Sequence, residues 1–131
     1  MHLIIDGYSD NRKLLQDKDH LCKWLEDCPA RIGMNRISPA YVLRYVGVNP
    51  ADWGISGFVF IAESHISVHT FVERSYVNID IFSCRDFDTE KTIEDLRNNF
   101  QLFKLRTSLI DREWPPEVAA TRPISFVHHG E

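Results

Sequence analysis

The chain has 131 residues, of which 44% are hydrophobic and 26% charged, and these proportions are ordinary for one globular domain with a modest core. The formal net charge is −4 and the sequence has no basic stripe, which argues against a nucleic-acid partner, because binding phosphates needs clustered Lys and Arg. No apolar run approaches the roughly 20 residues that a membrane helix needs, so we expect no membrane partner.

The chain begins with a pattern typical of a strand followed by a helix. The apolar run of His2–Tyr8 predicts a short, largely buried strand. A helix is then predicted from roughly Asp10 to Asp27, where apolar residues recur at near-helical spacing. We expect Pro29 to disturb this helix, although one further turn ending near Gly33 is compatible with the sequence.

The middle of the chain is rich in strand patterns. Four further strands are predicted in succession, at Ile37–Val48, Ile55–Glu63, His65–Glu73 and Ser75–Cys84. The segment Asn49–Gly54 has the composition of a turn. The last of the four strands alternates regularly, with Val77, Ile79 and Ile81 on one face. Its other face carries Tyr76, Asn78, Asp80 and Phe82.

The last third of the chain predicts a second helix and an edge strand. The helix is expected over Asp88–Phe103, with Asp88 or Thr89 as its cap and a stripe formed by Ile93, Leu96, Phe100 and Phe103. Residues 104–113 then suggest an edge strand. The segment that follows is broken by prolines, with one possible short strand at Ile124–His128.

This order of elements predicts the fold class. Consecutive strands with short links pair as antiparallel neighbours. We therefore expect one domain over residues 1–131, an α+β two-layer sandwich with helices on one face of an antiparallel sheet. The other face of such a sheet needs water or a partner, and its apolar strands favour a partner chain. We expect a homodimer.

The cysteines and the N-terminal residues bear on the compartment. Cys22, Cys28 and Cys84 form no CxxC pair and are odd in number, which favours a reducing cytoplasm over a disulfide scaffold. Polar and acidic residues interrupt the N-terminal segment at once, unlike a signal peptide. We expect a cytoplasmic protein.

Chemically capable residues gather unexpectedly in one predicted strand, around Glu63 and Ser64. Ser64 follows a buried strand next to a tight reversal, where its hydroxyl could simply cap a turn. His65 and His69 lie nearby on one strand face, and a His beside a Ser can activate the hydroxyl as a nucleophile. The pair could also bind a metal, but a strand holds residues four apart about 13 Å from one another, so the metal reading is weak.

Two stretches in this region carry a resemblance to a known family. Glu63–Thr70, ESHISVHT, and Ile79–Cys84, IDIFSC, resemble the signature of the prokaryotic S-adenosylmethionine decarboxylase family, pyruvoyl enzymes of polyamine synthesis. Gly54–Gly57, GISG, is similar to the family's Gly-aliphatic-Ser-Gly. The specific match runs from Gly54 to Cys84, and the remainder resembles the family in its layout.

The resemblance implies that the chain cuts itself between Glu63 and Ser64. The Ser64 hydroxyl would attack the Glu63 carbonyl and turn the amide into an ester. Elimination would then break the chain and leave dehydroalanine at position 64, which hydrolyses to a pyruvoyl group on residues 64–131. By resemblance, His69 is the base for the Ser64 α-proton and Ser56 assists the processing. Cys84 matches the residue that returns a proton to the substrate carbon, and Glu73 matches an acidic residue near the substrate ribose.

The resemblance also implies the activity and its cofactor. The pyruvoyl ketone derived from Ser64 would form a Schiff base with the substrate amine and act as the electron sink for decarboxylation, without metal or pyridoxal phosphate. The product would be the aminopropyl donor for spermidine.

Some positions depart from the family pattern and leave alternatives open. Pro50 stands about where a stacking aromatic is expected, with Trp53 nearby, and Arg85 replaces a Gly after the Cys. An arginine or ornithine decarboxylase on the same scaffold would suit the acidic residues Asp52, Glu73 and Asp80. An unprocessed, non-catalytic homologue that serves as a dimer partner or binding module is the third alternative.

Overall fold

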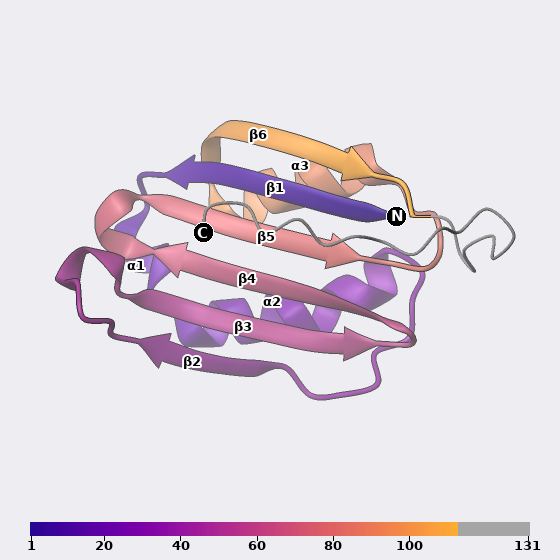
Figure 1. Ribbon diagram of the computed structural model, residues 1–131, viewed down its shortest axis with the longest axis horizontal. Coiled ribbons are helices and arrows are strands. Elements are labelled where there is room, and N and C mark those ends of the chain that lie inside the picture. Colours follow the sequence, from indigo (N-terminus) through magenta and orange to yellow (C-terminus); the bar gives the residue numbers. More distant parts are fainter. Residues whose placement is uncertain (113–131) are drawn as a thin grey trace, which may run out of the picture.

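The computed structural model describes residues 1–112, which form one antiparallel sheet backed by helices (Figure 1). The predicted strand at Ile124–His128 lies outside the described residues. The six strands lie in the order β2-β3-β4-β5-β1-β6. Their bounds are β1 His2–Ser9, β2 Tyr41–Tyr45, β3 Gly54–Ile61, β4 Ser64–Phe71, β5 Tyr76–Phe82 and β6 Leu102–Ile110. Every neighbouring pair is antiparallel, as the sequence predicted.

All helices lie behind the sheet in Figure 1, so the predicted two-layer α+β arrangement is confirmed. They are α1 Arg12–Leu15, α2 Lys18–Arg31 and α3 Thr89–Phe100, with 3₁₀ turns η1 Pro50–Asp52 and η2 Val72–Arg74. Between the layers lies the core, formed by Leu21, Trp24 and Leu25 of α2, Leu96 and Phe100 of α3, and the inner residues of the sheet. We call the uncovered side of the sheet the open face.

The predicted helix from Asp10 to Asp27 is wrong in its bounds. The chain forms two helices, because Asp17 breaks off α1 and caps α2, its carboxylate accepting a hydrogen bond from the His20 N–H at 3.0 Å. Pro29 does not end α2, which continues to Arg31. Because Pro29 lies in the last turn, its missing N–H removes one hydrogen bond there, while its ring is buried in the core.

The second predicted helix is confirmed except at its end. Asp88 caps α3, accepting a hydrogen bond from the Lys91 N–H at 3.0 Å. The helix stops at Phe100, and Gln101 takes a left-handed conformation with φ 53°. Phe103 therefore belongs to β6 and is exposed, so its prediction as part of the apolar stripe was wrong.

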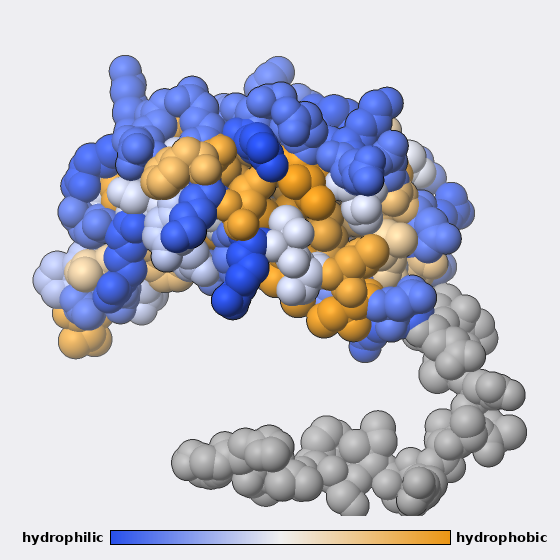
Figure 2. Space-filling view, turned by 90° about the horizontal axis from the view of Figure 1, so that it is seen from above, coloured by the Kyte–Doolittle hydropathy of each residue, from blue (hydrophilic) through white to orange (hydrophobic). Residues whose placement is uncertain are grey.

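The two edges of the sheet carry exposed apolar side chains. The predicted edge strand is confirmed as β6, which exposes Phe103, Leu109 and Ile110. Figure 2, viewed from this side, shows apolar atoms between strongly polar ones. At the other edge, β2 is shorter than the predicted Ile37–Val48 because the chain before it, around Pro39, meets β3 only at isolated points such as the Arg36–Ile61 bridge.

The alternation predicted for β5 is confirmed. Val77, Ile79 and Ile81 are buried toward the helices, while Asn78 and Asp80 lie on the open face. The same alternation places His65, Ser67 and His69 of β4 on the open face and Ile66, Val68 and Thr70 in the core. None of the helices within residues 1–112 is long and apolar enough to cross a membrane.

A glycine fixes how the start of β3 meets the end of β4. A Cβ added to Gly54 would lie 1.8 Å from the carbonyl oxygen of Thr70, far inside any real contact. Thr70 is itself held, because its hydroxyl donates to the Leu15 carbonyl at 2.7 Å and accepts from the Ile55 N–H at 2.9 Å. The backbone at position 54 therefore has no room for a side chain.

We expect Gly54→Ala to lower the free energy of unfolding by roughly 3 kcal/mol, because overpacking against fixed backbone cannot relax. Urea unfolding followed by fluorescence measures this change. Gly33→Ala is the control, since Gly33 has φ +76° but no atom near the new Cβ, and we expect a loss of about 1 kcal/mol. Equal losses in the two variants would contradict the close approach at Gly54.

Candidate functional site

The candidate site starts at the hairpin between β3 and β4. Ile61 pairs with Ser64, so only Ala62 and Glu63 make the reversal. Glu63 has φ 61°, a left-handed conformation that costs a non-glycine residue about 1–2 kcal/mol. The Ala62 N–H donates to the Asn35 carbonyl at 2.9 Å, which braces the turn from outside. The peptide bond that precedes Ser64 thus sits in a tight, strained and supported turn.

Cys84 lies directly against the Ser64 hydroxyl. The Cys84 backbone N–H donates to Ser64 Oγ at 3.1 Å, and the same hydroxyl donates to Cys84 Sγ at 3.6 Å. The thiol also lies 3.7 Å from the Glu63 carboxylate. Ser64 is buried while Cys84 is half-buried. The N–H holds the Ser64 oxygen in place at the strained turn, and the thiol lies within reach of the same hydroxyl.

Ser56 and His69 form a second pair, on the open face. They are register partners across β3 and β4, and Ser56 Oγ lies 2.8 Å from His69 Nδ1. Both line an open hollow of about 400 Å³ whose other walls include Tyr41, Phe58 and Phe60. The pair offers a hydroxyl and an imidazole beside an apolar hollow, which suits proton transfer to a bound organic molecule.

The two pairs do not meet within one chain. His69 lies five positions along β4 from Ser64 and points to the opposite face, so about 16 Å of strand separates them. His65 is also on the open face, where its ring packs against Phe82 with centroids 5.4 Å apart. Both histidines share one face, as the sequence predicted, and both rings lie on the face of β4 opposite to the Ser64 hydroxyl.

Glu73 lies in η2, at the end of β4 that is away from Ser64, and its carboxylate has strong hydrogen-bond partners. The Arg12 guanidinium donates to both carboxylate oxygens, and the Trp53 indole N–H donates to one of them at 2.9 Å. These hydrogen bonds, from Arg12 first and Trp53 second, lower the pKa of Glu73 to about 2. The Trp53 ring is also covered by Arg44, whose guanidinium carbon lies 4.7 Å from the ring centroid.

The other acidic residues singled out from the sequence are paired as well. Asp52 forms an ion pair with Arg74 at 3.0 Å, and Asp80 accepts from or pairs with His2 at 3.0 Å. With Glu73 bound to Arg12, each of the three carboxylates proposed for a cationic substrate already has a partner within this chain. In these positions they do not form a free acidic cluster.

Sequence reasoning missed a polar row that crosses the open face. Strand register aligns Arg106, Asp6, Asn78, His69 and Ser56 on five neighbouring strands, β6 to β3. Asn78 Oδ1 is buried and has no hydrogen-bond partner within residues 1–112. A sequence shows that each residue is on an outward position, but only the register shows that they adjoin.

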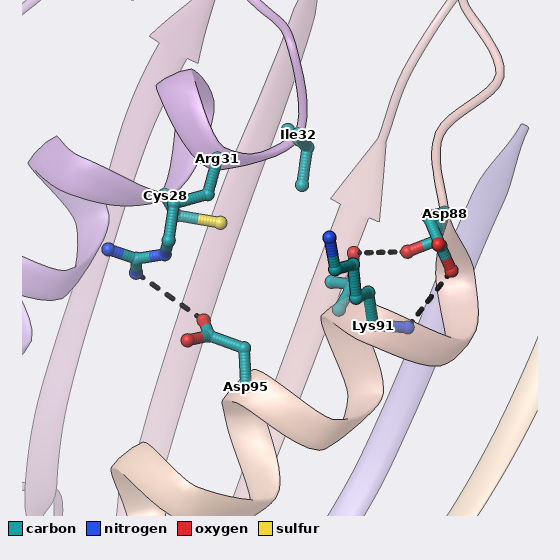
Figure 3. A pocket seen from close by; sticks show the side chains of 7 residues that line it. Cys28, Arg31, Ile32, Asp88, Lys91 and Asp95 are labelled. Atoms are coloured by element: carbon teal, nitrogen blue, oxygen red, sulfur yellow. Dashed lines mark hydrogen bonds and ion pairs between the residues drawn. The ribbon is translucent and has the colours of Figure 1, made fainter.

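A separate pocket of about 280 Å³ lies between the end of α2 and the start of α3 (Figure 3). Arg31 and Asp95 form an ion pair across it at 3.4 Å. The thiol of Cys28 points into this gap, and burial raises its pKa to about 12, so it stays protonated at neutral pH. None of the predicted catalytic residues lines this pocket.

Comparison with known proteins agrees with the geometry. A family model described as S-adenosylmethionine decarboxylase matches residues 1–113. The S-adenosylmethionine decarboxylase proenzyme of Clostridium botulinum (strain Loch Maree / Type A3) is 32% identical over 104 residues, which cover 79% of this chain and 84% of that protein. The proenzyme of Pyrococcus abyssi, with the same name, is 29% identical over 112 residues, covering 85% and 76% of the two chains.

The fold has a counterpart among solved structures. The adenosylmethionine decarboxylase from Aquifex aeolicus superposes with a TM-score of 0.67, covering 86% of this chain and 92% of that one at 18% identity. At this identity the likeness concerns the fold, and it places the same two-layer arrangement in that protein.

Glu73 generates a prediction about stability and pH. Because its folded pKa is about 2, below the ordinary 4.5, the carboxylate stabilises the fold above pH 4.5 and loses that contribution as the pH falls toward 2. We expect Glu73→Gln to be less stable than wild type at pH 6. The difference in stability between the two proteins should disappear as the pH falls from about 4.5 to 2. Thermal unfolding at stepped pH measures it, with Glu90→Gln on α3 as an exposed control. A difference in stability that does not change with pH would rule out the ion pair of Glu73 as its cause.

Proposed function

The chain belongs to the S-adenosylmethionine decarboxylase family, and we propose that it is a proenzyme that cuts itself between Glu63 and Ser64 and then decarboxylates S-adenosylmethionine. The observation that carries the proposal is the contact of the Ser64 hydroxyl with the backbone N–H of Cys84 at a strained hairpin. This is the position at which the family resemblance places the cleavage.

The hairpin supports self-cleavage on physical grounds. The left-handed turn at Glu63 stores strain in the residue whose carbonyl is attacked, and breaking the chain releases that strain. In the attack, Ser64 Oγ would bond to the Glu63 carbonyl carbon and the amide would become an ester. Loss of the Ser64 α-proton would then expel the Glu63 carboxylate, separating residues 1–63 from 64–131 and leaving dehydroalanine at position 64. Water would convert this dehydroalanine to the pyruvoyl group with release of ammonia.

Ser64 also fits as the precursor of the prosthetic group. The pyruvoyl group derived from it supplies a carbonyl that accepts electrons as carbon dioxide leaves the substrate. Cys84 would stay beside this position, with its thiol ready to return a proton to the substrate carbon. No metal and no pyridoxal phosphate is part of the proposal.

S-adenosylmethionine is the substrate that the relatives favour, since the curated proteins from Clostridium botulinum and Pyrococcus abyssi both bear its name. The product would then be the aminopropyl donor used to make spermidine. The alternative, a free basic amino acid, loses its support because Asp52, Glu73 and Asp80 are each engaged by a cation of this chain or by His2.

A homodimer would complete the site. His69 cannot reach Ser64 in its own chain, yet the resemblance assigns it the α-proton of a processing serine. The open face around His69 exposes Tyr41, Leu43, Phe58 and Phe60, a surface that a second copy would cover. In this dimer, His69 and Ser56 of one copy would act on Ser64 of the other copy, which lies beside that copy's Cys84.

Two variants separate processing from turnover. We expect Ser64→Ala to abolish both chain cleavage and carbon dioxide release from S-adenosylmethionine, because no ester can form. We expect Cys84→Ala to reduce turnover more than cleavage, since proton return concerns the substrate. Gel analysis and release of labelled carbon dioxide measure the two steps, with arginine and ornithine as competing substrates. Release from either amino acid alone would contradict the proposed substrate.

Mixing two inactive variants tests the shared site. A His69→Ala chain keeps its own Ser64, so we expect it to be cleaved only when paired with a Ser64→Ala chain that supplies His69. Differently tagged chains, refolded together and checked by native mass spectrometry, give the result. A partner that carries both substitutions is the control and should leave the chain whole. Cleavage of the His69→Ala chain by itself would contradict the proposal that His69 of one copy acts on Ser64 of the other.

A further inference from the structure

We propose that Ser83 is a positioning residue whose hydroxyl fixes the turn that holds Cys84 against Ser64. The inference rests on the proposed function for the reaction that it serves, but its geometry is independent of that reaction. Ser83 is fully buried and stands between the end of β5 and Cys84.

The Ser83 hydroxyl closes the turn around Cys84. It accepts a hydrogen bond from the Arg85 N–H at 2.9 Å and donates to the Arg85 carbonyl at 2.6 Å. Both backbone groups of Arg85 are therefore hydrogen-bonded to Ser83, and Cys84 lies inside the turn that these bonds close. A serine that bonds the backbone two residues ahead in this way is a known means of building a turn without glycine.

The backbone of Ser83 is anchored as well. Its N–H donates to the Met1 carbonyl at 2.9 Å, one residue beyond the register of β1 with β5. The hydroxyl also lies 3.3 Å from the Met34 sulfur, in the segment after α2. With its backbone fixed to β1 and its side chain fixed to Arg85, Ser83 leaves Cys84 little freedom. The Cys84 N–H and thiol are thus directed at Ser64.

A second buried serine provides a matched control. Ser9 is also fully buried, and its hydroxyl accepts a hydrogen bond from the Asn11 N–H at 3.2 Å, again two residues ahead. It lies at the other end of the sheet, away from Ser64. If burial of a serine were the whole effect, Ser9→Ala and Ser83→Ala would behave alike.

The first readout is chain cleavage. We expect Ser83→Ala to slow cleavage before Ser64 by about tenfold or more, because one lost hydrogen bond of ordinary strength already changes a rate by about that factor. Ser83→Thr, which restores the hydroxyl, should stay within about threefold of wild type, as should Ser9→Ala. Equal slowing in Ser83→Ala and Ser9→Ala would overturn the inference.

The second readout does not depend on cleavage. With Ser64→Ala as the background, the chain stays whole. Iodoacetamide then alkylates Cys84 at a rate that reports how firmly the thiol is held. Peptide mass spectrometry measures this rate, with Cys22 as the internal reference. We expect Ser83→Ala to raise this rate by about fivefold or more and Ser83→Thr or Ser9→Ala to leave it within about twofold. An unchanged rate in Ser83→Ala overturns the inference. If the wild-type chain is never cleaved, the proposed function fails while the alkylation rates still decide the role of Ser83.

Discussion

The contact between the Ser64 hydroxyl and the Cys84 backbone N–H, at 3.1 Å, is the interaction on which the whole site depends. Two chain reversals must coincide to make it. One is the hairpin at Ala62 and Glu63, which is braced by Asn35, and the other is the turn after β5, which is closed by Ser83. Because β4 and β5 are hydrogen-bonded neighbours, the ladder between them sets the distance between the two turns.

The pleat of β4 places two of the candidate site residues, Ser64 and His69, on opposite faces of the sheet. Ser64 points toward the helix layer, where it is buried, whereas His69 points to the open face, where Ser56 orients its ring. On that face a polar row passes through Asp6 and Asn78, beside a row formed by Tyr8, Tyr76 and Phe71. A second copy laid on this surface would bury the aromatic residues. Assembly and chemistry would be coupled in such a dimer, because His69 and Ser56 lie on the surface that the second copy would cover.

The local pattern of the sequence was enough to predict much of the fold. The alternation of β5 and the cap at Asp88 both report interactions within one element, and both were confirmed. The break before α2 was missed because Leu14 and Leu15 continue the apolar spacing across Asp17. Phe103 was misplaced for the same reason, since it keeps helical spacing from Phe100 although the helix ends with a left-handed Gln101.

What the sequence could not show were contacts between residues far apart in the chain. Glu73 matched a substrate-binding position, but its pairing with Arg12 depends on how α1 packs beside η2. Ser83 appeared only as part of a motif, and its bonds to Arg85 required the turn to be seen. The distance between Ser64 and His69 follows from strand geometry once β4 is placed, yet the motif ESHISVHT groups them as if they acted together in one chain.

The most direct measurement is the mass of the purified wild-type protein under denaturing conditions after incubation at neutral pH. The account predicts two chains, residues 1–63 and 64–131, with the second blocked at its amino end and its activity lost on treatment with a reagent that traps carbonyl groups. A single chain of 15.3 kDa that persists through the incubation, with an activity indifferent to that reagent, would contradict it.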